Sequence, residues 1–386
     1  MTQVPHRTIS LTAATIVGIS AMVGTGVFVA WNPAFELAGS YLLIALVIAA
    51  LIAGLNATSN ARLARMVPES GGAYIYGREC INPVVGQIAG WSFLIGKVAS
   101  ASAAALAIGI YLAPDYARYF SVASIAIVVM FNVLGIRYSI IAMAIMISIV
   151  LATLITLSAT AGIAEAGSAI NTEIPQGDVL GVFAGAGILF VAFAGYARIA
   201  VLGSEVKNAQ VTIPKAIAFS FGVVLLVYAI VAAVLLRAPQ SLTSETPLAE
   251  LARLISYPTW LVSLAAVLAA GSALFALVAG LGRMIFAMSL GGHLPRYFAQ
   301  LSGERSVPRR ADLTIGVVLI VITLAGSIAV NLAVSAVFVL IYYGVVHLSS
   351  WNRAGSTLLR RVIPPVGLLA NALVVVALVG VALTAR

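Results

Sequence analysis

The stretch Gly18-Ile19-Ser20-Ala21-Met22-Val23-Gly24-Thr25-Gly26-Val27-Phe28 places two glycines around a threonine inside an apolar run of membrane length. A second such interruption, Phe190-Val191-Ala192-Phe193-Ala194-Gly195-Tyr196, lies in the apolar run 179–202. Backbone that leaves the helix at membrane depth loses hydrogen bonds that lipid cannot replace, so such breaks persist only when buried in protein or lining a wet cavity. Two breaks in corresponding segments of two halves indicate the substrate site of a secondary transporter.

The composition places the chain in the membrane. Hydrophobic residues make up 62% and charged residues 9%, whereas soluble domains carry about 25% charge. A formal charge of +9 would suggest nucleic acid for a soluble protein, but here the basic residues lie between the apolar stretches. We therefore expect membrane lipid and no nucleic acid as a partner. The lone Cys80 and three scattered histidines predict no disulfide, metal or cofactor.

A spanning helix needs about 20 mainly apolar residues, and the sequence predicts eleven. Asn331 is expected to separate the ninth from the tenth, which would otherwise form one very long run. The fold class expected is an all-α polytopic membrane protein with spans at 11–36, 40–66, 84–112, 118–135, 138–163, 179–202, 213–236, 257–290, 313–330, 332–350 and 362–384.

Lysine and arginine predict the orientation, because they gather on the cytoplasmic side of membrane proteins. With the N-terminus cytoplasmic, four basic residues fall outside, Lys97 falls within a span, and all others of the 21 fall inside. The outside set is Arg118, Arg237, Arg253 and Arg386. The inside set is Arg7, Arg62, Arg65, Arg78, Arg137, Arg198, Lys207, Lys215, Arg283, Arg296, Arg305, Arg309, Arg310, Arg353, Arg360 and Arg361.

The two halves match in plan. Each begins with a broken helix and contains five spans, and this odd number inverts the second repeat relative to the first. The predicted domains are a first repeat at 1–163, an inverted second repeat at 164–351 and an additional helix at 352–386. In such inverted repeats the substrate site lies at the repeat interface near the bilayer midplane.

The breaks offer complementary backbone groups. Unwinding at Gly24-Thr25-Gly26 frees N–H groups at the positive start of the outer half-helix, a site for a carboxylate. The alternative is a small-residue packing face. Freed carbonyls near Phe193 can accept from an ammonium group, and Phe193 is either an aromatic gate or an ordinary packing residue. Donors for a carboxylate and acceptors for an amine together match an α-amino acid zwitterion.

Four stretches carry a resemblance to the amino acid–polyamine–organocation superfamily of permeases. They occur in that family's order and cover most of 11–350. They are Gly24-Thr25-Gly26-Val27-Phe28; Val67-Pro68-Glu69-Ser70-Gly71-Gly72-Ala73-Tyr74-Ile75-Tyr76 with Gly90-Trp91; Phe193-Ala194-Gly195-Tyr196 with Glu205-Val206-Lys207-Asn208 and Ile213-Pro214-Lys215-Ala216-Ile217; and Gly282-Arg283, Ala287-Met288 and Gly292-His293-Leu294-Pro295.

The resemblance implies a five-plus-five inverted-repeat fold and transport of amino acids or related amines. It also implies that Gly24, Thr25 and Gly26 meet the carboxylate. The amine would meet carbonyls around Phe190, Val191, Phe193 and Ala194, and Ala21 and Met22 would line the same pocket. The chain departs from the family in three ways: it has eleven rather than twelve helices, it has no lysine in 140–161, and it has Lys97 where some carriers of cationic amino acids have a carboxylate.

Lys97 is the intramembrane charge that needs an explanation. A lysine at this depth is costly and should face the bundle interior or a cavity. It is a proton carrier or fixed substitute for a coupling cation, a contact for an anionic or polar substrate side chain, or a structural residue. Each interpretation disfavours cationic substrates, because like charges would meet.

The sequence thus predicts an amino acid permease of the plasma membrane that moves neutral amino acids by alternating access. Exchange, export, and transport of acidic amino acids or related organic amines remain alternatives. An enzyme is not expected, because no activated nucleophile is evident in the spans. An ion channel would need a charge-lined pore or a carbonyl filter. Coupling to H⁺ or Na⁺ and the oligomeric state stay open; Ser20 and Ser272 either line a cation site or bond between helices.

Overall fold

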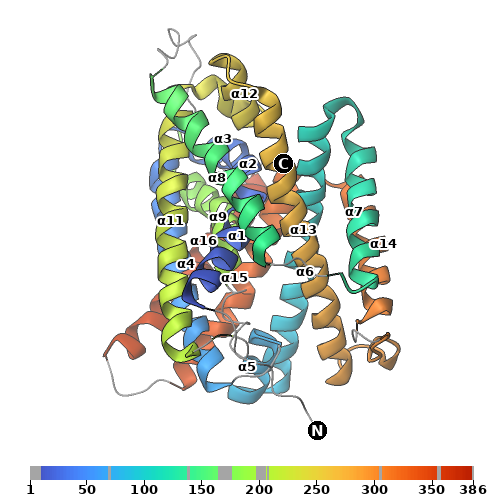
Figure 1. Ribbon diagram of the computed structural model, residues 1–386. Helices are drawn as coiled ribbons and strands as arrows, with labels where there is room; N and C mark the ends of the chain where they lie inside the picture. Colours follow the sequence, from blue (N-terminus) through green and yellow to red (C-terminus); the bar gives the residue numbers. More distant parts are fainter. Residues whose placement is uncertain are drawn as a thin grey trace.

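The computed structural model describes residues 10–67, 71–136, 140–163, 176–196, 206, 208–303, 307–353 and 358–384. These residues form helices and no β-strand (Figure 1). The α-helices are α1 Leu11–Met22, α2 Gly26–Val29, α3 Trp31–Ala38, α4 Leu42–Met66, α5 Ala73–Cys80, α6 Pro83–Leu112, α7 Ala117–Val133, α8 Ile140–Ile163, α9 Val179–Phe193, α11 Ala209–Arg237, α12 Pro247–Leu254, α13 Thr259–Leu290, α14 Arg309–Ala325, α15 Ile328–Asn352 and α16 Leu358–Thr384.

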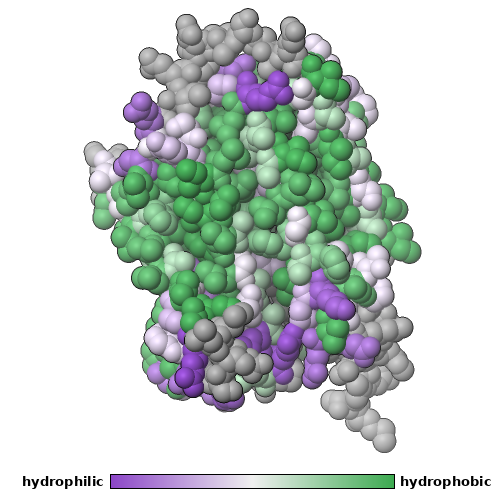
Figure 2. Space-filling model, turned by 90° about the vertical axis from the view of Figure 1, so that its left-hand side faces the viewer, coloured by the Kyte–Doolittle hydropathy of each residue, from purple (hydrophilic) through white to green (hydrophobic). Residues whose placement is uncertain are grey.

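Ten helical segments of the described chain are long and apolar enough to cross a membrane. The position of the remaining predicted span is taken by α14, whose 17 residues lie at the short end of the range for spanning helices. Figure 2 shows a hydrophobic band across the middle of the molecule, with hydrophilic residues towards both ends. On α4, Leu43, Val47 and Leu51 are exposed at helical spacing, as expected of side chains that face lipid.

The predicted interruption of the first span is confirmed. Its helix ends at Met22, residues 23–25 are not helical, and the chain resumes as α2 and α3. The second predicted break is confirmed as far as the structure describes it: α9 ends at Phe193 and a 3₁₀ turn, η2, follows at Ala194–Tyr196. Residues 197–202, which we expected to complete that span, lie outside the described residues.

The prediction that Asn331 separates two spans is wrong. The helices part at Gly326 and Ser327, where the Ser327 hydroxyl caps α15 by accepting from the Val330 N–H at 3.3 Å. A serine at this position replaces a missing helical partner. Asn331 is buried one turn inside α15 and donates to the Ser102 hydroxyl of α6 at 2.9 Å. Its amide therefore joins two helices instead of ending one.

Helix α6 is the central element of the bundle. Between Val98 and Gly109 every residue is buried, and most of them are alanine or serine. Small side chains let neighbouring helices approach closely in membranes, and α7, α13, α14 and α15 all pack against α6. Helices α1 and α9 lie on another side of the bundle, where α1 packs on α11 and α9 packs on α4.

Four basic residues that the structure describes lie at the two ends of the bundle in the groups that the charge pattern predicts. Figure 1 shows α5 at the lower end and α12 at the upper end. Arg62 and Arg353 belong to the α5 end, since Arg353 donates to the Glu79 carbonyl and Arg62 to that of Ser350. Arg237 ends α11 beside α12, which carries Arg253. The repeat boundaries at 1–163, 164–351 and 352–386 stay a prediction.

Candidate substrate site

The first break has a defined backbone path. The Val23 N–H makes the last bond of α1, to the Ile19 carbonyl at 2.7 Å, and the Gly24 N–H turns back to the Met22 carbonyl at 2.8 Å. The Gly24 N–H is therefore already used in this conformation. The first N–H groups of α2 have no partner within their own helix, as at every helix start. The Thr25 side chain is 9% exposed, and its hydroxyl oxygen has no hydrogen-bond partner among the described residues.

The two breaks pack directly against each other. A Cβ atom added to Gly26 would lie 2.4 Å from the Cβ of Ala192, and one added to Gly195 would lie 2.0 Å from the Ala21 carbonyl oxygen. Real side chains do not approach so closely, so both positions require glycine. The packing interpretation of Gly26 is thus correct for this conformation, and a role for its backbone towards a ligand stays a prediction.

Tyr228 of α11 joins the ends of both broken helices, and sequence reasoning missed it. Its hydroxyl donates to the Met22 carbonyl at 2.8 Å and lies 3.4 Å from the Ala192 carbonyl. Carbonyls at a helix end lack partners in their own helix, and this hydroxyl satisfies them inside the membrane. The signal available in the sequence was one tyrosine in an otherwise apolar run, a residue whose hydroxyl needs a partner when buried.

Aromatic rings surround the second break. Phe193 is fully buried, with its ring centroid 5.0 Å from that of Tyr228 and 5.4 Å from that of Phe221. Phe190 is also fully buried and meets Tyr343 of α15 edge-on at 6.0 Å. Phe193 therefore packs as an aromatic core residue here, and its role as a gate stays a prediction.

The remaining predicted site residues come together around the same two helix ends. Met22 and Ala194 are buried, whereas Ala21 and Val191 are partly exposed. Ala21 and Met22 end α1, and Val191 lies in the last turn of α9 just before Ala194. The structure thus gathers the predicted set from two segments about 170 residues apart in the sequence.

Lys97 lies at the middle of α6 and is partly buried. Side chains four before and three after a helical residue share its face; for Lys97 these are Phe93 and Ser100. The Phe93 ring packs on Tyr342, and the Ser100 hydroxyl lies 2.5 Å from that of Ser335, both on α15. Lys97 is therefore on the side of α6 that borders α15.

Other candidate positions are explained by local bonding or fall outside the described residues. The Ser20 hydroxyl donates to the Met143 carbonyl at 3.5 Å and the Ser272 hydroxyl to the Ala269 carbonyl at 2.9 Å, so the two hydroxyls bond to different carbonyls. The charged residues expected after the second break, Arg198, Glu205 and Lys207, and Glu69 after α4, lie outside the described residues.

Two of the motif stretches meet at the α5 end of the molecule. The hydroxyl of Tyr74 in α5 hydrogen-bonds with Nδ1 of His293, in the loop after α13, at 2.8 Å, and the two rings pack edge-on. Gly72, with φ of +54°, lies where an added Cβ would be 2.4 Å from the Tyr342 hydroxyl. The Gly-Gly pair is thus required by backbone conformation and by close packing.

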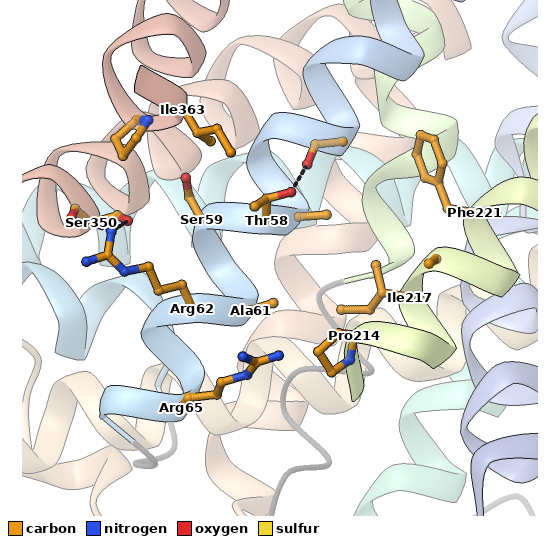
Figure 3. Close-up of a pocket in the computed structure, with 14 residues that line it drawn as sticks. Thr58, Ser59, Ala61, Arg62, Arg65, Pro214, Ile217, Phe221, Ser350 and Ile363 are labelled. Carbon is orange, nitrogen blue, oxygen red and sulfur yellow. Dashed lines mark hydrogen bonds between the residues drawn. The ribbon is translucent and has the colours of Figure 1, made fainter. Parts of the chain in front are cut away.

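A cavity of about 650 Å³ lies beside the breaks and not between them. Residues of α4 and α11 form most of its walls, and α15 and α16 complete them (Figure 3). Its nearest link to the breaks is Phe221, which lines the cavity and packs against Phe193. The sequence did not predict this cavity.

A bundle of membrane-spanning helices with two interrupted segments in contact defines a polytopic membrane transporter. The sequence model described as amino acid permease matches residues 9–385, so the chain belongs to the amino acid permease family, within the amino acid–polyamine–organocation superfamily.

Several relatives are transporters. An uncharacterized transporter of Mycobacterium tuberculosis is 38% identical over 372 residues, which cover 94% of this chain and 84% of the relative. The branched-chain amino acid permease BcaP of Bacillus subtilis is 27% identical, with 86% of this chain and 79% of the relative covered. Cationic amino acid transporter 3, mitochondrial, of Arabidopsis thaliana is 26% identical, with 90% of this chain and 61% of the relative covered.

Two solved structures share the fold. A Na⁺-coupled sialic acid symporter superposes with a TM-score of 0.62 at 12% identity, covering 96% of this chain and 89% of the symporter. The manganese transporter of Eremococcus coleocola superposes with a TM-score of 0.58 at 15% identity, covering 96% and 86%. These similarities identify the five-plus-five inverted-repeat transporter fold with broken first and sixth helices.

Proposed function

We propose that this permease is a secondary-active carrier that moves neutral amino acids across the plasma membrane by alternating access. One observation carries the proposal: the two interrupted helices meet within the membrane-spanning part, beside a buried Thr25 hydroxyl that has no hydrogen-bond partner among the residues that the structure describes. An unsatisfied buried hydroxyl is costly, and a substrate carboxylate that arrives when the breaks separate would satisfy it. Gly24 and Gly26 permit the backbone to approach that carboxylate.

The amine end of the substrate would meet the carbonyls at the end of α9, around Phe190, Val191, Phe193 and Ala194. In the present conformation the Tyr228 hydroxyl takes the place of the amine as a donor, because it donates to the Met22 carbonyl and lies 3.4 Å from the Ala192 carbonyl. We propose that an ammonium group competes with this hydroxyl for the same acceptors. Binding then loosens the contact between the breaks, which is the step that an alternating-access carrier needs.

Preference for neutral substrates follows from the surroundings of the breaks. The side chains that the structure places there are apolar or aromatic, chiefly Met22, Phe193 and Phe221. Within the described residues no carboxylate is placed against either break, so a cationic side chain would lack a counter-charge there. The branched-chain amino acid permease among the relatives is consistent with this preference. The cationic amino acid transporters among them are the reason to include lysine in the uptake assay.

The orientation completes the proposal. The α5 end carries more of the basic side chains, so it faces the cytoplasm by the positive-inside rule, with the N-terminus on the same side. Lys97 is the candidate for coupling or selectivity. Exchange and export use the same geometry and differ only in the gradients that drive them.

Reconstitution tests the proposal. The full chain is placed in liposomes and assayed for uptake of labelled leucine, alanine, glutamate and lysine, with and without proton and sodium gradients. We expect saturable uptake of the neutral substrates, competed by unlabelled substrate. Uptake that requires substrate on the far side would identify exchange. Lysine transported better than leucine, or flux that does not saturate, would contradict the proposal.

A further inference from the structure

His347 is a fully buried titratable side chain that the proposed substrate site does not use. It lies in α15, and both of its ring nitrogens face α4. Nε2 is 2.7 Å from Oδ1 of Asn56, and Nδ1 is 2.9 Å from the Ser59 hydroxyl oxygen. A Cβ added to Gly367 of α16 would lie 2.1 Å from Cε1 of the ring. Three helices therefore hold the imidazole in one place.

The hydrogen bonds fix the proton on one ring nitrogen and allow a change at the other. Asn371 of α16 donates its side-chain N–H to Oδ1 of Asn56 at 3.1 Å, so this oxygen is an acceptor and Nε2 of His347 donates to it. The Ser59 hydroxyl can donate to a neutral Nδ1 or accept from a protonated one. The same ring position thus suits both the imidazole and the imidazolium form, and only the hydroxyl of Ser59 has to turn.

The cavity beside α4 brings the Ser59 hydroxyl within reach of water. Thr58 and Ser59 line the cavity on α4, and Ser350 lines it on α15 (Figure 3). Arg65, an exposed residue in the last turn of α4, lines it as well, so the cavity extends to the α5 end. Its volume of about 650 Å³ exceeds the roughly 30 Å³ that one water molecule takes up in the liquid. Ser59 therefore lies at the boundary between the cavity and the buried ring.

Few titratable or charged groups surround His347. From α16 the neutral residues Gly367 and Asn371 approach it, and Lys97 of α6 borders the face of α15 that carries Tyr342. No acidic residue is hydrogen-bonded or ion-paired with the ring in the part of the chain that the structure describes. A charge buried in this way is costly, so the ring is neutral in this closed arrangement. The nearest titratable or charged side chains are Arg62, one turn after Ser59 on α4, Tyr343, one turn before His347 on α15, and Tyr196 after α9.

The same group of residues reaches the second break. The Tyr343 ring packs on Phe190 at 6.0 Å and on Tyr196 at 5.6 Å between ring centroids. The Tyr196 hydroxyl and the side-chain nitrogen of Asn56 are buried without a hydrogen-bond partner among the described residues. Unsatisfied buried groups are costly, and a shift of α15 against α4 can give them partners. The surroundings of His347 and the break therefore change together.

We propose that His347 binds a proton that reaches it from the cavity through Ser59. A hydronium ion in the cavity gives its proton to Oγ of Ser59 while the hydroxyl proton of Ser59 passes to Nδ1. This leaves water, an intact serine hydroxyl and an imidazolium ring. The ring holds the proton when the α5 end opens to water and loses it when that end closes. Binding of the proton does not depend on transport, whereas its movement with the substrate rests on the proposed function.

Proton binding is tested by nuclear magnetic resonance on the full chain in lipid nanodiscs, with ¹⁵N-labelled histidine. The sequence holds three histidines, so His347→Gln identifies the signals of His347 by their loss. We expect only Nε2 to carry a proton at pH 8, and Nδ1 to become protonated as the pH falls to 4. Ser59→Ala keeps the ring and removes the acceptor of the new N–H group, so the midpoint should fall by at least about one pH unit.

Thr58→Ala is the matched control, because Thr58 lines the same cavity but donates to the Gly54 carbonyl of its own helix. Its midpoint should equal that of the unmodified chain. A ring that stays neutral throughout, or the same midpoint shift in Thr58→Ala as in Ser59→Ala, would overturn the proposal.

Coupling is tested in liposomes that contain a pH-sensitive dye and are driven by a leucine gradient. We expect His347→Gln to lower the proton movement per leucine at least about fivefold while exchange of labelled for unlabelled leucine continues. Unchanged proton movement in this variant, or its loss in Lys97→Gln instead, would refute coupling through His347. If no amino acid is transported at all, the proposed function fails, and the magnetic resonance titration still decides whether His347 binds the proton.

Discussion

The hydroxyl of Tyr228 donates to the carbonyl oxygen of Met22 at 2.8 Å and lies 3.4 Å from that of Ala192. One side chain of α11 thus holds the ends of two interrupted helices that are far apart in the sequence. Three elements, α1, α9 and α11, therefore meet at this hydroxyl.

Removal of that hydroxyl should weaken the closed arrangement. In Tyr228→Phe the ring contacts with Phe193 remain while the bond to Met22 is lost, at a cost of about 1 kcal/mol. We expect a small fall in melting temperature and a change in transport rate of about fivefold or more. Thermal unfolding in detergent and liposome uptake measure the two effects. Tyr257→Phe, which removes an exposed hydroxyl bonded to Thr156, should leave uptake unchanged; equal effects in both variants would exclude a specific role for Tyr228.

The close contact between Gly26 and Ala192 can be tested by a second substitution that restores part of the stability lost in the first. Gly26→Ala places a Cβ 2.4 Å from that of Ala192, and such overpacking costs about 1–3 kcal/mol. The double variant Gly26→Ala with Ala192→Gly should recover only part of this stability, because it removes the Cβ–Cβ contact but leaves the added Cβ 2.6 Å from the Cα of residue 192; energies of residues in contact are not additive. Thermal melting of the two single variants and the double variant measures the coupling. Strict additivity would show that these positions do not touch, and Gly54→Ala, at an open position, should change little.

A substitution at Thr25 should change substrate binding without lowering the stability of the fold. In Thr25→Val the side chain keeps its shape and loses a hydroxyl that has no described partner. Stability should therefore stay the same or rise, while KM for a neutral amino acid should increase about tenfold, because a bond to the substrate carboxylate is lost. Thr25→Ser should keep the native KM. An unchanged KM in Thr25→Val would show that the Thr25 hydroxyl does not bind the substrate carboxylate.

Lys97 is tested through the pH profile of uptake. If its ammonium group couples transport, Lys97→Gln should flatten the dependence of uptake on pH by removing a titratable charge from the centre of α6. Uptake of leucine is measured from pH 5 to pH 9 at fixed membrane potential. Lys215→Gln, a lysine near the start of α11, provides the control. An identical profile in Lys97→Gln would exclude a coupling role for Lys97.

The helices and the first break could be predicted from the sequence because their physical causes are local. Runs of apolar residues set span length, and two glycines around a threonine weaken a helix locally, because glycine permits backbone conformations outside the helix. Asn331 misled the prediction because a polar residue between two apolar runs has two uses. It can mark a loop, or it can bond across helices, as it does to Ser102.

The rest of the site depends on contacts between distant segments. Tyr228 matters because α11 crosses the ends of α1 and α9, and no pattern within α11 reports that crossing. The cavity likewise depends on the packing of four helices, α4, α11, α15 and α16, whose residues line it. The short helices α5 and α12 were not predicted, since each has only eight residues and receives much of its stability from the surfaces on which it packs.

The contact between Tyr74 and His293 joins residues 219 positions apart at the α5 end of the bundle. In the alternating access that we propose, an opening that parts α5 from the loop after α13 would separate these two side chains. Their bond would then contribute to the free-energy difference between the conformations open to one side and to the other. A substitution at either residue would change the lifetime of the conformation closed at this end, and so the turnover, without touching the proposed substrate site.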